Sequence, residues 1–478
     1  MKTRHYLACL AGATMLAGCN LAPDYERPES AIPVALPDGG IYPAAATDAP
    51  DITQLGWRDF FLDARLRHVI ETGLANNRDL RIAAGNVLQA RALLRVQRSD
   101  LLPTVAASGT ATYTNNATAA AGSTGAGAGV GTTSGSDLEF YSVNAGISAF
   151  ELDLFGRVRN LSRAAQEQVF ASEEAQRSTR ISLIAETANA WLAMASDQEQ
   201  LRIARETLET FRQTLDLTSA QFRIGVGSEL EVQQAQTSYQ AARNDIAVLE
   251  TRIAQDQNAL NLLVGTTVPA ELLPAGLAVG DVTLDALPAN LSSDILLRRP
   301  DVLQAEHQLI AENANIGAAR AAFFPTISLT GTVGTIGTAL ASLFSGGSFT
   351  YAAAPGISLP IFDGGGRQGN LDYARASEQL AVATYERTIQ TAFREVSDAL
   401  AQRGRIGEQV AAQTARADAA TGAARLSDAR FRAGVDSFLV TLDAQRTAYA
   451  AEQQLVTTRL TRASNLIELY RSLGGGLS

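Results

Sequence analysis

Several residue types are scarce in this sequence. It has one lysine, Lys2, two cysteines, Cys9 and Cys19, and three histidines. No histidine begins an H-E-x-x-H motif and no glycine precedes a lysine, so the sequence offers neither a zincin site nor a phosphate-binding P-loop. The net charge of -10 argues against a nucleic-acid partner. We therefore expect no enzyme, no metal site and no bound nucleic acid.

The first residues predict a cleaved secretory signal. A basic start is followed by an apolar stretch too short to span a bilayer. Leu16-Ala17-Gly18-Cys19 then resembles a lipobox, which predicts a signal peptide over 1–18 and a covalent lipid on Cys19. An ordinary signal peptide with a chance cysteine is the alternative. Asn20, where an Asp would favour retention at the inner membrane, favours the outer membrane.

The mature chain begins with a proline-rich segment. Residues 19–56 hold six prolines, which predicts an extended lipidated arm rather than a packed domain. No later segment has 18 consecutive apolar residues, so no transmembrane helix is expected. Cys9 leaves with the signal, so the mature chain cannot form an internal disulfide.

One phrase occurs twice. Residues 222–230 read FRIGVGSEL and residues 431–439 read FRAGVDSFL, 209 positions later. Other pairs, such as Asp79 and Asp301, keep a similar spacing, so the mature chain reads as a tandem duplication. The period is too long for a solenoid and predicts two similar halves side by side. The expected domains are repeat 1 over 57–265, a linker over 266–295, repeat 2 over 296–474 and a tail over 475–478.

Each half contains two stretches with the two-residue period of a β-strand. In TISLTGTV, Ile327 and Leu329 lie on one face and hydroxyl side chains lie on the other. An apolar face opposite an uncharged polar face is typical of a transmembrane β-barrel, and a soluble β-sandwich is the alternative. A Gly, Ala, Ser and Thr tract over 119–136 predicts a loop between the first two strands. The expected strands follow Pro103 and Pro325 and return over 141–149 and 351–359.

Four strands are too few to close a transmembrane barrel. An open sheet edge in lipid would leave unpaired backbone groups, each costing several kcal/mol, so we expect an oligomer in which each protomer contributes four strands. A dimer would give eight strands and a trimer twelve, and the residues alone leave this choice open.

Two long proline-free runs, 157–221 and 367–430, predict very long helices. At ~1.5 Å per residue, a helix of about 65 residues spans about 100 Å. The run after the second phrase has coiled-coil spacing, with Leu442, Tyr449 and Val456 seven residues apart. Each half is therefore expected to join a β-hairpin to a long α-hairpin, which is an α+β fold.

Several segments are specific in combination: LAPDYERP (21–28), GWRDFFLDARL (56–66), LLRRPDVLQAE (296–306), AAFFPTISLTG (321–331) and ISLPIFDGGGR (357–367). Together they resemble the outer-membrane efflux factors of the TolC/OprM type, most closely the lipoprotein branch labelled NodT. The resemblance covers essentially the whole mature chain. It implies a homotrimer with a twelve-stranded membrane β-barrel continuous with a long periplasmic α-helical barrel.

The resemblance also implies a function. Such proteins form the exit duct of a tripartite efflux pump, in which a resistance-nodulation-division transporter of the inner membrane supplies the energy and a periplasmic adaptor seals the joint. Flow through the duct would be passive, and no cofactor is expected apart from the lipid on Cys19. A type I protein-secretion duct and a structural trimeric lipoprotein of the outer membrane are the alternatives. The substrate is not readable, although the presence of one mature methionine, Met194, disfavours a methionine-lined copper or silver path.

In this family the turns at the periplasmic end contact the adaptor and close the resting channel. The glycine of each phrase permits the left-handed backbone that reverses two antiparallel helices, although turn chemistry alone could explain any one residue. Phe438 is expected to make one of two docking grooves more apolar. The predicted adaptor-binding residues are Arg223, Gly225, Val226, Gly227, Ser228, Arg432, Gly434, Val435, Asp436 and Ser437.

Relatives also carry rings of Asp and Arg above the tips. Arg425 matches such an arginine, but Gly422 stands where the acid is expected. Asp418 and Asp428 are the nearby acids, so the possible gate consists of Asp418, Arg425 and Asp428.

Overall fold

The computed structural model describes residues 20–43, 55–114, 138–277, 282–284 and 292–475. The predicted signal peptide, Cys19 and the tract over 119–136 lie outside these residues. The chain forms two compact units. The first takes in the chain up to residue 28 together with 87–171 and 306–383, and the second takes in 29–86, 172–305 and 384–478.

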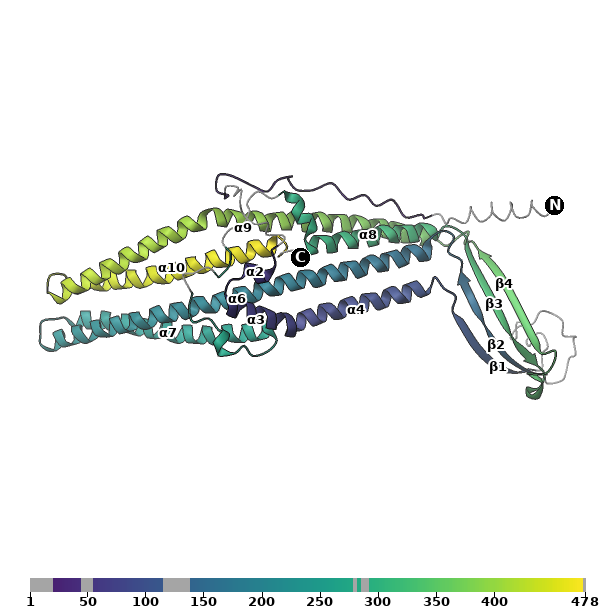
Figure 1. The fold of residues 1–478 in the computed structure, drawn as a ribbon, viewed down its shortest axis with the longest axis horizontal. Helices are drawn as coiled ribbons and strands as arrows, with labels where there is room; N and C mark the ends of the chain where they lie inside the picture. The colour runs from purple at the N-terminus through teal and green to yellow at the C-terminus, as the bar shows by residue number, and fades with distance from the viewer. Residues whose placement is uncertain (1–19, 44–54, 115–137, 278–281, 285–291, 476–478) are drawn as a thin grey trace. The chain divides into compact units, whose positions relative to one another are not determined.

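The elements follow the order expected from the sequence (Figure 1). They are α2 (Trp57–Phe60), α3 (Ala64–Asn76), α4 (Arg78–Ser99), β1 (Val105–Thr114), β2 (Leu138–Glu151), α6 (Arg157–Arg223), α7 (Glu229–Val264), η1 (Ala270–Leu272), η2 (Ser293–Arg298), α8 (Pro300–Ala321), β3 (Thr326–Gly337), η3 (Leu340–Ser342), β4 (Phe349–Ser358), α9 (Gly366–Arg432) and α10 (Phe438–Ser472).

The four strands form one antiparallel sheet in the order β1-β2-β3-β4. Neighbouring strands in the sheet are also neighbours in sequence, and β1 and β4 are its two edges. The register shifts between Ile147 and Phe150, where Ala149 has a φ of 50° and donates its N–H to Thr330 Oγ1 at 3.1 Å. This irregularity lies near the end of β2 that leads into α6, where β-bulges commonly bend a strand.

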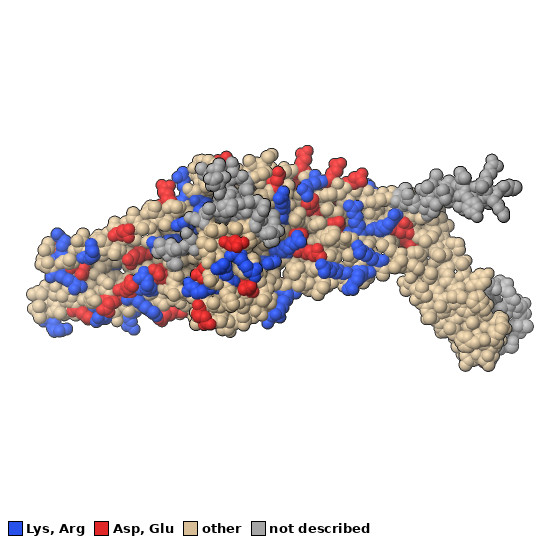
Figure 2. Space-filling model, viewed as in Figure 1, with Lys and Arg blue, Asp and Glu red and all other residues tan. Residues whose placement is uncertain are grey.

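The sheet carries few charges. Figure 2 shows acidic and basic side chains along the long helices and almost none over the strands on the face in view. Hydroxyl groups instead pair across strands, as where Thr110 and Ser142 lie 2.7 Å apart. The Tyr113 and Tyr141 rings meet edge to face near the end of β1, with centroids 6.1 Å apart.

The two helices predicted from proline-free runs are present at the expected length. α6 and α9 each contain 67 residues. Figure 1 shows each beside its shorter return helix, α7 or α10. Among the helices that the structure describes, none combines the length and the apolar character needed to cross a membrane.

The proline-rich arm runs from Asn20 to Pro43 without a helix or strand, apart from an isolated bridge at Ala35 and a turn in which the Tyr42 N–H donates to the Gly39 carbonyl at 3.1 Å. Arg27 binds the Glu306 carboxylate of α8 through two hydrogen bonds of 2.8 Å, and Tyr25 donates to the same carboxylate. A Cβ on Gly317 would lie 2.7 Å from Ala22, so the arm approaches α8 closely. These contacts explain why a segment without secondary structure keeps a defined path.

The second unit is held partly by aromatic packing near its C-terminal end. The Phe60 and Tyr470 rings stack with centroids 4.2 Å apart, and both side chains are fully buried. The Tyr470 hydroxyl donates to the Gly475 carbonyl at 2.6 Å, which satisfies the buried polar group. The stacking of Phe60 on Tyr470 joins the short α2 to the end of α10.

Candidate functional site at two helix-turn-helix tips

The first tip reverses the chain between α6 and α7. Gly225 has a φ of 81°, a left-handed conformation that favours glycine. Its N–H donates to the Phe222 carbonyl at 3.0 Å, and the Val226 N–H donates to the Gln221 carbonyl at 3.0 Å. This is the Schellman arrangement, which satisfies carbonyl groups left free at the end of a helix.

The second tip repeats this arrangement between α9 and α10. Gly434 has a φ of 73° and donates its N–H to the Phe431 carbonyl at 2.9 Å. The Val435 N–H reaches the Arg430 carbonyl at 2.9 Å. Both predicted glycines therefore occupy the backbone conformation that the turn requires.

The two tips start their return helices differently. Ser228 forms a capping box with Glu231: its Oγ accepts from the Glu231 N–H at 3.3 Å, and its own N–H donates to the Glu231 carboxylate at 2.9 Å. Ser437 holds the same position before α10 and makes no hydrogen bond of this kind from its side chain.

An ion pair supports the second tip instead. Arg430 binds the Asp436 carboxylate through two hydrogen bonds of 2.7 and 2.8 Å. The Arg430 guanidinium holds the pKa of the Asp436 carboxyl below its ordinary value. The first tip has Gly227 and Gln221 at the matching positions, and a Cβ on Gly227 would lie 3.1 Å from the Gln221 Cβ. The repeated phrase predicts Asp436 but not Arg430, whose only signal in the sequence is its position six residues before Asp436.

The aromatic residues of the two phrases have opposite environments. Phe431 and Phe438 are buried, with 9% and 1% of their surface exposed, and their ring centroids lie 5.9 Å apart. They pack with Ala235 of α7, whereas 47% of Phe222 is exposed. The expectation that Phe438 adds an apolar docking surface is therefore wrong, because this side chain joins the core between the two hairpins.

Smaller apolar side chains cover the outside of both tips. Ile224 and Val226 are each 73% exposed in the first tip, and Val435 is 63% exposed in the second. Leu230 and Leu439, at matching positions after each turn, are 66% and 61% exposed. The predicted residues Arg223 and Arg432 are also exposed, and Arg432 pairs with Asp428 at 2.8 Å. A partner approaching either tip would thus meet an apolar surface beside an arginine.

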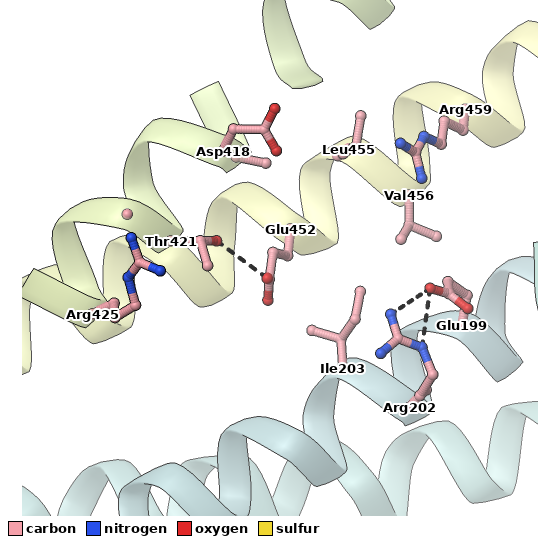
Figure 3. A pocket seen from close by; sticks show the side chains of 12 residues that line it. Glu199, Arg202, Ile203, Asp418, Thr421, Arg425, Glu452, Leu455, Val456 and Arg459 are labelled. Carbon is pink, nitrogen blue, oxygen red and sulfur yellow. Dashed lines mark hydrogen bonds and ion pairs between the residues drawn. The ribbon is translucent and has the colours of Figure 1, made fainter. Parts of the chain in front are cut away.

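The three predicted gate residues lie on α9 and do not pair with one another. Figure 3 labels two of them, Asp418 and Arg425, and no dashed line joins these two. Asp418 and Arg425 line one cavity of about 420 Å³, together with Glu199 of α6 and Glu452 of α10. Within the described part of the chain, Asp418 and Arg425 form no ion pair, and Asp428 is engaged by Arg432 as described above. Burial raises the pKa of Glu452, which also accepts a hydrogen bond from Thr421 at 3.3 Å.

Within the described ranges, no three His, Cys, Asp or Glu side chains gather as a metal site.

The chain matches a known protein family along most of its length. The model of the outer membrane efflux protein family matches residues 69–266 and 291–475. The chain is 44% identical to the probable efflux pump outer membrane protein TtgC of Pseudomonas putida, over 99% of this chain and 96% of that protein. It is 38% identical to the cation efflux system protein CusC of Escherichia coli, over 97% of this chain and 98% of that protein.

Solved structures agree with the sequence comparison. A membrane protein from Pseudomonas aeruginosa superposes with a TM-score of 0.86 at 37% identity, over 96% of this chain and 98% of that one. The open state of the MtrE outer membrane channel of Neisseria gonorrhoeae gives a TM-score of 0.83 at 36% identity, over 96% and 99% of the two chains.

Long α-hairpins ending in glycine turns, combined with an open four-stranded sheet, define an outer-membrane channel with a periplasmic extension. The chain belongs to the outer membrane efflux protein family and is of the TolC/OprM type. Its role is transport, as the outer-membrane channel of a tripartite efflux pump.

Proposed function

We propose that this chain forms a homotrimeric exit duct that passively conducts small molecules from an adaptor and an inner-membrane resistance-nodulation-division transporter to the exterior. The observation that carries the proposal is the four-stranded sheet, in which the outer strands β1 and β4 each pair on one side only. An edge strand in lipid leaves its backbone groups unsatisfied, so these edges need partners from other copies. Three copies would close a barrel of twelve strands.

The two tips are the proposed adaptor-binding surface. Their exposed apolar side chains and arginines surround turns whose backbone is fixed by Schellman hydrogen bonds, so a partner would meet a preformed surface. A trimer would present six tips of two alternating kinds. The exposed surfaces of the two kinds differ in the Arg430–Asp436 pair and in Phe222, whereas Phe438 is buried and adds nothing to either surface.

Two further assignments remain proposals. The proposed gate consists of Asp418, Arg425 and Asp428, which do not pair with one another within the chain. A gate built from them would therefore need either side chains of a neighbouring copy or the release of Asp428 from Arg432. Lipidation of Cys19 rests on the lipobox resemblance, with signal peptide 1–18 removed. Arg320 of α8 donates to the Leu21 carbonyl at 3.2 Å, so the residues next to this cysteine are tied to the helix that leads into β3.

We also propose that the chain is an internal duplication, with repeat 1 over 57–265, a linker over 266–295 and repeat 2 over 296–474. α4 and α8 have 22 residues each, α6 and α9 have 67 each, and the family model matches the chain in two segments. The two compact units divide the chain differently, since each takes residues from both repeats. This is expected where two hairpins lie side by side along their length.

The proposed substrates are organic compounds rather than metal ions. Relatives at 44% identity are named for toluene and antibiotic efflux, and CusC, named for cation efflux, is 38% identical. The one mature methionine, Met194, is 1% exposed, so its sulfur is not available to line a path. Export of toluene and of copper by cells that rely on this channel would separate the two classes.

Native mass spectrometry of the detergent-purified protein tests the oligomer, and conductance in planar bilayers tests the duct. We expect three protomers and stable open-channel currents. A monomer or dimer would overturn the trimer, and a trimer without conductance would favour a structural lipoprotein. Cys19→Ser tests the anchor separately: we expect loss of lipid labelling, and unchanged fractionation and export would show that lipidation is dispensable.

Adaptor docking needs substitutions that leave the trimer intact. We expect Gly225→Asp and Gly434→Asp to abolish resistance while the trimer still forms, because each places a charge and a strained backbone at a tip. Gly407→Asp on α9 is the matched control, since a Cβ at Gly407 meets nothing within 4 Å. Normal resistance in both tip variants would exclude the tips as the adaptor-binding surface.

A further inference from the structure

A separate cavity lies in the second unit, away from the tips. It has a volume of about 360 Å³, within the range of pockets that hold small organic ligands. Five parts of the chain line it: α2, α6, the end of η2, the first turn of α8 and the segment that follows α10. None of the residues assigned above to the tips or the gate lines this cavity.

One side of the cavity is apolar. Trp57 of α2 and Ile184 of α6 are buried, with 7% and 3% of their surface exposed, and both contribute to the lining. Pro300 and Leu303 in the first turn of α8 complete this side. An indole and branched aliphatic side chains offer a binding surface to an aromatic ring or a short alkyl chain.

The other side is cationic. Arg177, Arg180 and Arg298 line the cavity together with one acid, Glu174, so the lining carries three positive charges and one negative charge. Glu174 is already bound by Arg177 at 2.7 Å. Arg180 and Arg298 form no ion pair and no side-chain hydrogen bond within the described ranges. Among the described residues that line the cavity, positive charges exceed negative charges by two, and this excess attracts anions.

We propose that this cavity binds a small amphipathic organic anion. Its apolar part would lie against Trp57 and Leu303, and its carboxylate or phosphate would accept hydrogen bonds from Arg180 and Arg298. Guanidinium groups bind such oxyanions with two parallel hydrogen bonds, and the apolar wall favours anions that carry an apolar part. A free aromatic acid and an anionic phospholipid share this chemistry, so the experiment must separate them.

The two tryptophans of the chain make the site measurable. In full-length Trp191→Phe protein, held in a non-ionic maltoside detergent, Trp57 is the remaining tryptophan and lies in the cavity wall. The probe is 4-iodobenzoate, whose iodine quenches indole fluorescence on contact. We expect saturable quenching, and at least tenfold weaker binding after Arg298→Gln or Arg180→Gln. Arg387→Gln, on an exposed arginine of α9, should leave binding unchanged.

Three comparisons decide the result. Trp57→Phe protein, which keeps Trp191, should show no saturable quenching. The neutral 4-iodobenzamide should bind much more weakly than the acid. Quenching that rises linearly without saturation, or equal binding of acid and amide, would overturn the proposal. Competition by benzoate but not by dioctanoyl phosphatidylglycerol would indicate a free acid as the ligand, and the reverse result would indicate a lipid.

A second measurement avoids the tryptophan substitutions, because Trp191 is 2% exposed and its replacement could disturb folding. Benzoate should raise the apparent melting temperature of the unmodified protein, since a ligand that binds the folded state stabilises it. This increase should disappear in Arg298→Gln and persist in Arg387→Gln. An increase that is equal in all three proteins would also overturn the proposal.

Discussion

Arg299 and Asn77 perform the same task at two places in the chain. Asn77 immediately precedes α4 and donates its side-chain N–H to the Leu263 carbonyl at 2.8 Å, near the end of α7. Arg299 immediately precedes α8 and donates to the Ser472 carbonyl at 2.6 Å, at the end of α10. Each long hairpin therefore returns to a side chain that satisfies a carbonyl group in its last turn.

The arginine is the more costly of the two donors to remove. Its side chain is 7% exposed and also binds Asp301 at 2.7 Å and Glu395 at 3.0 Å. Arg299→Met would leave the Glu395 carboxylate without its nearest partner in a partly buried position. We expect a loss of about 3 kcal/mol in the free energy of unfolding. Chemical denaturation of the detergent-solubilised protein, followed by circular dichroism, measures this.

Asn77→Ala is the matched control for the arginine. It removes a neutral hydrogen bond, so we expect a loss of about 1 kcal/mol. The double variant Arg299→Met, Glu395→Met should recover part of the stability, because it removes the unpaired charge as well. Equal losses in the two single variants would show that the ion pairs of Arg299 contribute nothing.

The aromatic pair at the second tip gives another prediction. Phe438→Ala empties a site that is 99% buried, and a cavity left by a phenylalanine costs about 3–5 kcal/mol. We expect the end of the second hairpin to open locally, with faster deuterium exchange over residues 427–442. Phe222→Ala should leave exchange at the first tip nearly unchanged, because Phe222 is 47% exposed. Equal effects at both tips would contradict the observed difference in burial.

Much of this fold was predictable because backbone rules act locally. Strand alternation, the absence of proline from α6 and α9, and the glycine turns all depend on residues close in sequence. The opposite burial of Phe222 and Phe431 was not predictable, because the two residues occupy the same place in nearly the same phrase. The burial of each phenylalanine depends on which helix packs against it, and for Phe431 that helix is α7, which contributes Ala235. The pairing of the gate residues was not predictable for the same reason. Whether a side chain of α9 meets a partner on another helix depends on how α9 is rotated about its own axis, and the spacing of residues along α9 does not specify that rotation.

A pH dependence is expected from the first hairpin. Burial raises the pKa of Asp256 on α7 to about 6, the Asp197 carboxyl on α6 adds to the shift, and Arg252 opposes it. The folded state then binds a proton more tightly than the unfolded state, in which this pKa is near the ordinary value of 3.8 for an Asp side chain. This contribution to stability is complete below about pH 4 and is lost as the pH rises to about 6. Solvent screening of this partly exposed group limits it to about 1 kcal/mol.

Asp256→Asn tests this dependence. The variant should be more stable than the wild-type protein above pH 6, and its stability should change less between pH 4 and pH 6. The measurement is the midpoint of urea unfolding at each pH. Asp443→Asn on α10 is the control, since Asp443 is exposed and should leave the pH profile as it is. A stability difference between the wild-type protein and Asp256→Asn that stays constant between pH 4 and pH 6 would contradict the pKa shift.

The Arg430–Asp436 pair should govern the mobility of the second tip rather than the stability of the protein. The Arg430 side chain is 58% exposed and the Asp436 side chain 21% exposed, and ion pairs that solvent reaches contribute little to the free energy of unfolding. Asp436→Asn should therefore increase deuterium exchange at the second turn without changing the apparent melting temperature. Arg430→Gln should give the same increase, and the double variant should add nothing further, because one interaction is lost in all three. Additive effects would show that the two side chains act separately on the turn, and unchanged exchange would show that the Schellman hydrogen bonds of Gly434 and Val435 hold the turn without the pair.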